Sequence, residues 1–215
     1  MVYPIIKLIV MPVYKLWLRK VQGLENLPKN GPFIIVANHS SYYDALLLHS
    51  IIIPKINKKI HALVHYNYWH NPVTRVILDW GECIPVFVKN GSKAQKKNKK
   101  AIEKAVNYLK NKGIIQIFPE GTRSSDGKLK KAYTGIARLV LEAKVPVLPT
   151  GITDSHKVLP KGKIFPRFTR CEVKIGKLMY FKEYYEKKTN KKILENITRR
   201  IMKEIAKLIG QKYNF

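Results

Sequence analysis

Short apolar runs alternate with stretches of helical periodicity along most of the chain. Residues Phe33–Ala37 form a continuous apolar run of the kind found in strands buried on both faces. Further strands are predicted at 60–64, 83–88, 114–118, 145–152 and 172–175. Helices are predicted between them at 42–52, 72–80, 92–112 and 134–144. This alternation predicts a single α/β domain with a largely parallel sheet flanked by helices.

Two of the predicted helices carry further signals in the sequence, one for packing and one for where the helix ends. Near the C-terminus, apolar residues recur at the spacing of one helix face, which predicts a closing amphipathic helix packed on the core. Its members are Ile193, Ile197, Ile201, Ile205 and Leu208. Earlier in the chain, Pro54 is expected to limit the helix over 42–52.

The first twenty residues are strongly apolar but interrupted. Lys7 and Lys15, with Pro4 and Pro12, make them poor material for an uninterrupted membrane span. On a helix, Lys7, Lys15 and Arg19 share a narrow arc and apolar residues cover the rest, which is typical of a helix lying in the membrane interface. A buried N-terminal helix is the alternative. We therefore expect an anchoring segment over 1–20 and one domain over 21–215.

The excess of basic residues indicates what kind of partner the protein binds. Lys and Arg total 41 against 14 Asp and Glu, a formal net charge of +27, which favours a polyanionic partner such as nucleic acid or an anionic membrane. No helix-turn-helix signature, RNA-binding aromatic motif or zinc spacing accompanies the charge, so nucleic acid is not the expected partner. Cys83 and Cys171 form no ligand or disulfide pattern, which indicates a reducing compartment. With no signal-peptide pattern, we expect the cytoplasmic side of the cell membrane.

Candidate chemistry begins after the first apolar run. His39 stands just before a predicted helix and Asp44 one turn inside it, so the two side chains can face each other. A carboxylate that fixes one ring nitrogen leaves the other to act as a general base. The alternative is that Asp44 caps the helix and His39 is structural. A metal site with His49 is disfavoured because these positions scatter around the helix.

A second loop is expected at the same edge of the sheet. No nucleophile motif occurs in the chain, so a histidine base would act on a hydroxyl of a bound substrate. The loop Phe118–Ser124 follows a predicted strand and contains Gly121, which permits close approach of the backbone, and Arg123, whose planar guanidinium suits a phosphate. An ordinary turn with a surface arginine is the alternative.

Three motifs, in this order, resemble the glycerolipid acyltransferase family, most closely its bacterial-type lysophosphatidate acyltransferases. They are Asn-His-x4-Asp at 38–44, Phe-Pro-Glu-Gly-Thr-Arg-Ser at 118–124 and Val-Pro-Val-x-Pro at 145–149. The resemblance covers residues 23–152, whereas the C-terminal third matches loosely. It implies that 21–215 is an acyltransferase domain.

The resemblance also implies a reaction: an acyl group passes from an acyl thioester to the hydroxyl of 1-acyl-glycerol 3-phosphate, giving phosphatidic acid. His39 is then the base and Asp44 its orienting partner, and no metal or cofactor takes part. The implied acceptor-binding residues are Lys89, Glu120, Gly121, Thr122 and Arg123. The family has an arginine near Lys89, and here Lys89 or Asn90 fills that position.

Several features stay open at this level. The donor is acyl carrier protein or coenzyme A, and the acceptor is lysophosphatidate, glycerol 3-phosphate or another lysophospholipid. A lipid-binding module without catalysis is a further alternative. Acyl-chain length, the donors that stabilise an oxyanion and the oligomeric state do not follow from the sequence.

Overall fold

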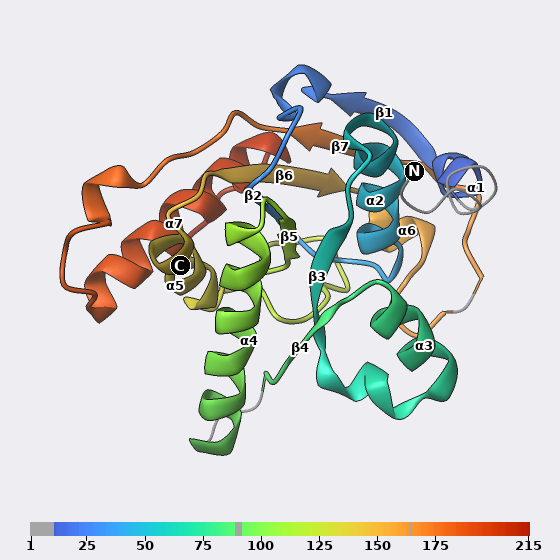
Figure 1. Ribbon diagram of the computed structural model, residues 1–215. Coiled ribbons are helices and arrows are strands. Elements are labelled where there is room, and N and C mark those ends of the chain that lie inside the picture. The colour runs from blue at the N-terminus through green and yellow to red at the C-terminus, as the bar shows by residue number, and fades with distance from the viewer. Residues whose placement is uncertain (1–10, 89–91, 164) are drawn as a thin grey trace.

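The computed structural model describes residues 11–88, 92–163 and 165–215, within which seven strands form one sheet (Figure 1). The strands are β1 (Leu18–Gln22), β2 (Phe33–Ala37), β3 (Ile60–His65), β4 (Ile84–Val86), β5 (Ile114–Ile117), β6 (Val147–Thr153) and β7 (Cys171–Ile175). They lie in the order β1-β7-β6-β2-β5-β3-β4, and only the β6–β7 pair is antiparallel. The predicted α/β fold with a largely parallel sheet is confirmed.

Helices cover both faces of this sheet. One face packs against α2 (Tyr43–Ile56), with α1 (Met11–Lys15) and α6 (Ser155–Val158) beside it. The other packs against α4 (Ser92–Lys110), α5 (Gly135–Ala143) and α7 (Lys191–Leu208). The 3-10 helices are η2 (Leu24–Asn26), η3 (Tyr66–His70) and η4 (Lys182–Tyr184). Central strands are thus buried on both sides, as their continuous apolar runs predict.

One helix, α3 (Pro72–Trp80), stands apart from these layers. It begins with Pro72 after an Asn71 cap, whose side chain accepts hydrogen bonds from the backbone N–H groups of Val73 and Thr74. None of its side chains is buried, and in Figure 1 it lies at the lower right, beyond the sheet.

Helix α2 is longer than predicted. Pro54 was expected to end it, but the helix continues to Ile56 and ends at Asn57, which adopts a left-handed conformation and donates its N–H to the Ile53 carbonyl. Because Pro54 lies in the last turn, its missing N–H removes one hydrogen bond near the end of the helix rather than breaking the middle.

The N-terminal prediction is wrong in part. The helix expected to extend to Arg19 ends at Lys15, and Leu18 begins strand β1, which pairs with β7. Strand β7, about 150 residues later in the chain, supplies the hydrogen bonds as a parallel partner. No local pattern in residues 18–22 predicts this pairing. Residues 1–10, the rest of the expected interfacial helix, lie outside the described residues. Among the helices that are described, none has the length and apolarity needed to cross a membrane.

The C-terminal stripe is confirmed as core packing. Ile197, Ile201 and Ile205 are fully buried on the inner side of α7, against α5 and β6. Asn190 caps the start of this helix by accepting a hydrogen bond from the Ile193 N–H.

The parallel strands bring the candidate residues to one edge. Strands β6, β2, β5, β3 and β4 all point the same way, so the loops that follow their carboxyl ends meet at that edge. The two motifs that carry His39 and Arg123 follow the neighbouring strands β2 and β5.

Candidate active site

His39 and Asp44 form the hydrogen-bonded pair that their spacing predicts. Nδ1 of His39 lies 2.8 Å from Oδ2 of Asp44. The Asp44 side chain is fully buried, while that of His39 is 20% exposed. An ionised carboxylate beside Nδ1 favours the tautomer that carries its proton there, which leaves Nε2 to accept a proton.

The Asp44 carboxylate is held by the backbone as well. Its Oδ2 atom also accepts hydrogen bonds from the N–H groups of Ser40 at 2.7 Å and Ser41 at 2.8 Å. Asp44 therefore holds the backbone just before α2 and contacts His39 at the same time. Its second oxygen, Oδ1, is buried and has no hydrogen-bond partner among the described residues.

The imidazole is also fixed from the neighbouring strand. The His39 ring stacks on Phe118, with 4.1 Å between ring centroids and 14° between planes. The backbone carbonyl of His39 accepts a hydrogen bond from the Ser124 N–H at 2.8 Å. The loop after β5 thus defines both the ring plane and the backbone position of His39.

Glu120 joins the two loops through a buried carboxylate. Its Oε1 accepts the His39 backbone N–H at 2.9 Å, and its Oε2 accepts the Lys130 backbone N–H at 2.8 Å. Burial raises the pKa of Glu120 to about 7, although the two N–H groups act in the opposite direction. In this structure, Glu120 positions the backbone that carries the histidine.

Gly121 occupies a position that favours glycine. Its φ is +64°, and a Cβ atom there would lie 2.9 Å from the Tyr133 ring. The same hypothetical atom would lie 3.4 Å from Val88, at the end of the segment that follows β4. The loop after β5 therefore runs directly beside the chain that leads to Lys89.

Arg123 lies flat on an aromatic ring. Its guanidinium carbon is 3.3 Å from the centroid of the Tyr42 ring. Tyr68 lies edge to face with Tyr42, with 6.0 Å between ring centroids, and its nearby hydroxyl lowers the pKa of Tyr42; the charge of Arg123 acts in the same direction. Nη1 of Arg123 is buried and has no acceptor among the described residues, so the donors of this guanidinium are not all used within the described part of the chain.

Three of the predicted acceptor-site residues remain: Thr122, Lys89 and Asn90. Thr122 is exposed on the loop after β5. Lys89 and Asn90 lie outside the described residues, so the structure does not decide between them.

The loop after β6 closes the other side of His39. Asn38 exchanges two hydrogen bonds with the Ile152 backbone, both 2.8 Å long. The hydroxyls of Ser40 and Ser155 lie 2.7 Å apart, and the Ser41 hydroxyl donates to the Leu159 carbonyl at 2.9 Å. Three sheet-end loops therefore hold the catalytic candidate.

Sequence reasoning missed several of these partners. Tyr42 and Phe118 stand inside the two motifs, so the motif boundaries were a usable signal for both. Tyr68, Lys130 and Ser155 carry no pattern of their own, and only the packing of distant loops brings them to the site.

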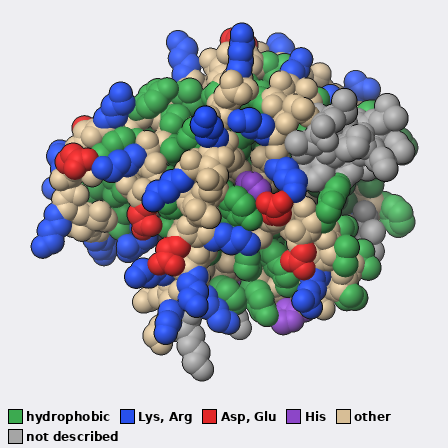
Figure 2. Space-filling view, viewed as in Figure 1, with side chains coloured by type: hydrophobic (Ala, Val, Ile, Leu, Met, Phe, Trp, Pro, Cys, Tyr) green, Lys and Arg blue, Asp and Glu red, His purple; other side chains and the backbone are tan. Residues whose placement is uncertain are grey.

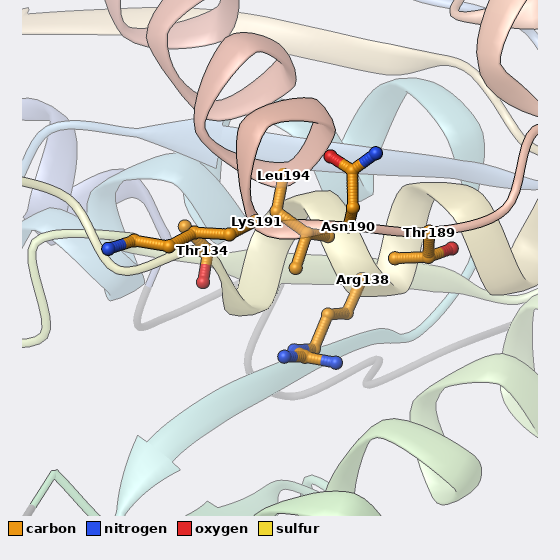
Figure 3. A pocket seen from close by; sticks show the side chains of 6 residues that line it. All are labelled: Thr134, Arg138, Thr189, Asn190, Lys191 and Leu194. Carbon is orange, nitrogen blue, oxygen red and sulfur yellow. The ribbon is translucent and has the colours of Figure 1, made fainter.

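The described part of the chain offers no alternative metal centre: it contains no group of three or more His, Cys, Asp or Glu residues placed to hold an ion. A surface cavity of about 420 Å³ lies where α5 and α7 begin, and Figure 3 shows Asn190 and Arg138 extending from it in opposite directions. It is lined by Thr134, Arg138, Thr189, Asn190, Lys191 and Leu194. None of these is a predicted site residue.

Comparison with known proteins places this site in a family. The profile of the Acyltransferase family matches residues 18–153. The 1-acyl-sn-glycerol-3-phosphate acyltransferase of Bacillus subtilis is 30% identical over 146 residues, which are 67% of this chain and 69% of that protein. A chloroplastic 1-acyl-sn-glycerol-3-phosphate acyltransferase of Brassica napus is 26% identical over 151 residues, 70% of this chain but only 41% of the relative.

A solved structure supports the fold. The crystal structure of the 1-acyl-sn-glycerophosphate (LPA) acyltransferase PlsC from Thermotoga maritima superposes with a TM-score of 0.70 at 23% identity. The match covers 98% of this chain and 80% of that one. The family resemblance expected from the three motifs is confirmed: the chain belongs to the Acyltransferase family.

Proposed function

We propose that the protein transfers an acyl group from an acyl thioester to the free hydroxyl of 1-acyl-glycerol 3-phosphate, giving phosphatidic acid. The observation that carries this proposal is the 2.8 Å contact between His39 Nδ1 and the fully buried Asp44 carboxylate. The relatives named for the same reaction support the choice of substrate.

In this reaction His39 is the general base. Nε2 takes the proton of the acceptor hydroxyl as its oxygen attacks the thioester carbonyl, and Asp44 stabilises the imidazolium that forms. The tetrahedral oxyanion then re-forms the carbonyl and the carbon–sulfur bond breaks. The thiolate leaves with the proton returned by His39, so the enzyme ends in its starting state. No covalent enzyme intermediate is required.

Arg123 is the proposed phosphate ligand. Its stack on Tyr42 fixes the guanidinium plane, and its buried Nη1 atom lacks an acceptor among the described residues. A planar donor fork of this kind suits two phosphate oxygens. Lys89 or Asn90, Gly121 and Thr122 complete the proposed acceptor site, with Glu120 holding the loop against His39.

The setting proposed for this reaction is a membrane surface. The acceptor carries an acyl chain that stays in the bilayer, and a net charge of +27 favours anionic lipid. We propose that residues 1–20 anchor the domain peripherally or monotopically on the cytoplasmic side of the cell membrane, and that 21–215 form the catalytic domain. The donor is acyl carrier protein or coenzyme A thioester.

The test is acyl transfer to lysophosphatidate in anionic vesicles, with matched acyl carrier protein and coenzyme A thioesters. We compare wild type with His39→Ala and Asp44→Asn, and use His70→Ala, an exposed histidine of η3, as the control. Loss of general-base catalysis lowers turnover by about 10²–10⁴-fold. We expect that loss in both site variants, with unchanged thermal unfolding, and full activity in the control.

Other outcomes discriminate among the alternatives. Full turnover by His39→Ala would sink the mechanism. Activity only with glycerol 3-phosphate or another lysophospholipid would replace the acceptor and keep the chemistry. Folded, vesicle-bound protein that turns over neither donor with any acceptor would indicate a lipid-binding module.

A further inference from the structure

Helix α3 turns its apolar residues outward. Its exposed apolar side chains follow the i, i+3, i+4, i+7 pattern of one helix face and are 52 to 69% exposed. They are Val73, Val76, Ile77 and Trp80. Thr74 and Leu78 point the other way and are half-buried. Val73, Val76 and Ile77 on this stripe face water, although an amphipathic helix normally packs such residues against a partner.

A second apolar projection follows α6. Phe165 is 82% exposed and Phe168 is fully exposed. The surrounding residues are basic, and from Ser155 to Cys171 the sequence contains neither Asp nor Glu. The exposed cations here are Lys161, Lys163, Arg167 and Arg170, of which Arg170 is exposed to solvent beside Phe168.

Both projections adjoin the residues just before α2, beside the active site. The Ser41 hydroxyl donates to the Leu159 carbonyl, just after α6, at 2.9 Å. The Tyr42 ring meets the Tyr68 ring edge to face, with 6.0 Å between centroids, and Tyr68 belongs to η3, the turn directly before α3. Tyr42 in turn lies under Arg123. In Figure 1 the chain after α6 descends along the right edge toward α3, and Figure 2 shows apolar side chains at the lower right, where α3 lies.

Helix α1 extends the same edge. The Cys171 N–H donates to the Trp17 carbonyl at 2.8 Å, which ties the end of the Phe165–Phe168 segment to the chain just after α1. Val13 on α1 and Leu16 just after it are exposed, whereas Tyr14 and Trp17 pack on Tyr43, next to Asp44. Exposed apolar groups thus border the site from α1 to α3.

We infer that the outer face of α3 and the Phe165/Phe168 projection insert together into an anionic phospholipid surface and hold the opening of the site at headgroup depth. Apolar side chains whose charged neighbours are mostly Lys and Arg match the acyl region and the anionic headgroups of such a surface. The acidic neighbours Asp79 and Asp154 are each ion-paired, with Arg75 and Lys157. A second copy of this chain would bring like charges together, which opposes self-association through this surface. The contact is additional to the proposed anchor at 1–20, and it rests on the proposed function only in having a lipid-borne acceptor to reach.

The test measures co-sedimentation of the full chain with phosphatidylcholine vesicles that contain or lack phosphatidylglycerol. Two double variants remove the apolar groups: Val76→Ser with Ile77→Ser, and Phe165→Ser with Phe168→Ser. Each is expected to lower vesicle partitioning by about tenfold, because two apolar side chains no longer leave water. The matched control is Tyr180→Ser with Phe215→Ser, whose side chains are exposed to 51 and 50% outside this surface.

Charge is tested separately from apolarity. Lys163→Gln with Arg167→Gln is expected to weaken binding to vesicles with phosphatidylglycerol and to leave binding to neutral vesicles unchanged. Lys188→Gln with Lys192→Gln removes two exposed lysines elsewhere and is the control. Thermal unfolding verifies the fold of every variant.

Three outcomes overturn the inference. In the first, both apolar double variants bind vesicles as well as wild type does; in the second, the Tyr180/Phe215 control loses as much binding as they do. In the third, the apolar variants change their oligomeric state while vesicle binding is unchanged. A further readout separates this inference from the proposed function. Turnover of detergent-dispersed lysophosphatidate is expected to be normal in the apolar variants. A chain that binds vesicles as described but turns over no acceptor would refute the function and leave the membrane contact standing.

Discussion

Two regions lie at the same edge of the sheet: the junction between β2 and α2, and the projection formed by η3 and α3. They differ in which side chains are buried and which are exposed. At the junction, Asp44 and Glu120 are buried and accept hydrogen bonds from four backbone N–H groups, those of His39, Ser40, Ser41 and Lys130. In α3 no side chain is buried, and the apolar ones face water.

This difference separates two tasks. A general base must be held to within a fraction of an ångström, which requires buried partners whose own positions are fixed. A surface that enters a fluid bilayer needs only exposed apolar area and neighbouring positive charge. Tyr42 connects the two regions, because it lies under Arg123 and its ring meets the Tyr68 ring edge to face.

The largest expected contrast is in stability. Leu47 on α2 is fully buried, and Leu47→Ala is expected to lower the free energy of unfolding by about 2–5 kcal/mol. Val76→Ala on α3 is expected to change it by no more than about 0.5 kcal/mol, because that side chain already faces water. Chemical denaturation measures both. A Val76→Ala loss as large as that of Leu47→Ala would contradict the contrast.

Glu120 gives the junction a dependence on pH. Since burial raises its pKa in the folded state to about 7, above the ordinary value of 4.5, the protonated carboxyl stabilises the fold at low pH. That contribution is lost as pH rises through about 7. Relative to Glu120→Gln, which does not titrate, wild type is expected to lose stability between pH 5 and pH 8, by about 2 kcal/mol.

Chemical denaturation of both proteins at each pH checks this sign. Glu142→Gln, at an exposed position on α5, serves as the control and is expected to follow wild type. A stability difference between Glu120→Gln and wild type that is the same at both pH values would refute the raised pKa.

Gly121 tests how tightly the second loop is held. Gly121→Ala places a Cβ atom in a left-handed conformation and 2.9 Å from Tyr133, so we expect a loss of about 1–2 kcal/mol in unfolding free energy, with reduced turnover. Gly135→Ala has nothing within 4 Å of the new atom and begins α5, so it is expected to be neutral or slightly stabilising. Equal effects at the two positions would show that the loop tolerates movement.

The smallest expected effect lies where the two regions meet. Arg123→Lys keeps the positive charge but loses the planar fork and the stack on Tyr42, so we expect the KM for lysophosphatidate to rise about tenfold while kcat changes less. Arg138→Lys on α5 is the matched control, because that arginine lies in the cavity of Figure 3. An unchanged KM in Arg123→Lys would remove Arg123 from the phosphate site.

Local patterns in the sequence determined the core strands and the pairing of His39 with Asp44. Continuous apolar runs define β2 and β5 because both faces of a central parallel strand are covered. A histidine and an aspartate five residues apart across a strand-to-helix junction meet because the helix start fixes their geometry within one turn. These features depend on neighbours in the chain, which a single sequence displays.

Tertiary structure alone decided the rest. Strand β1 exists because β7 supplies its hydrogen bonds, although the helical pattern of the preceding residues extends as far as Leu18 and Arg19. Glu120 reaches the backbone of residue 39, and Tyr68 reaches Tyr42, only because parallel strands bring separate loops to one edge. Whether the apolar stripe of α3 faces the core or water likewise depends on where the helix lies, since periodicity defines a face but not what covers it.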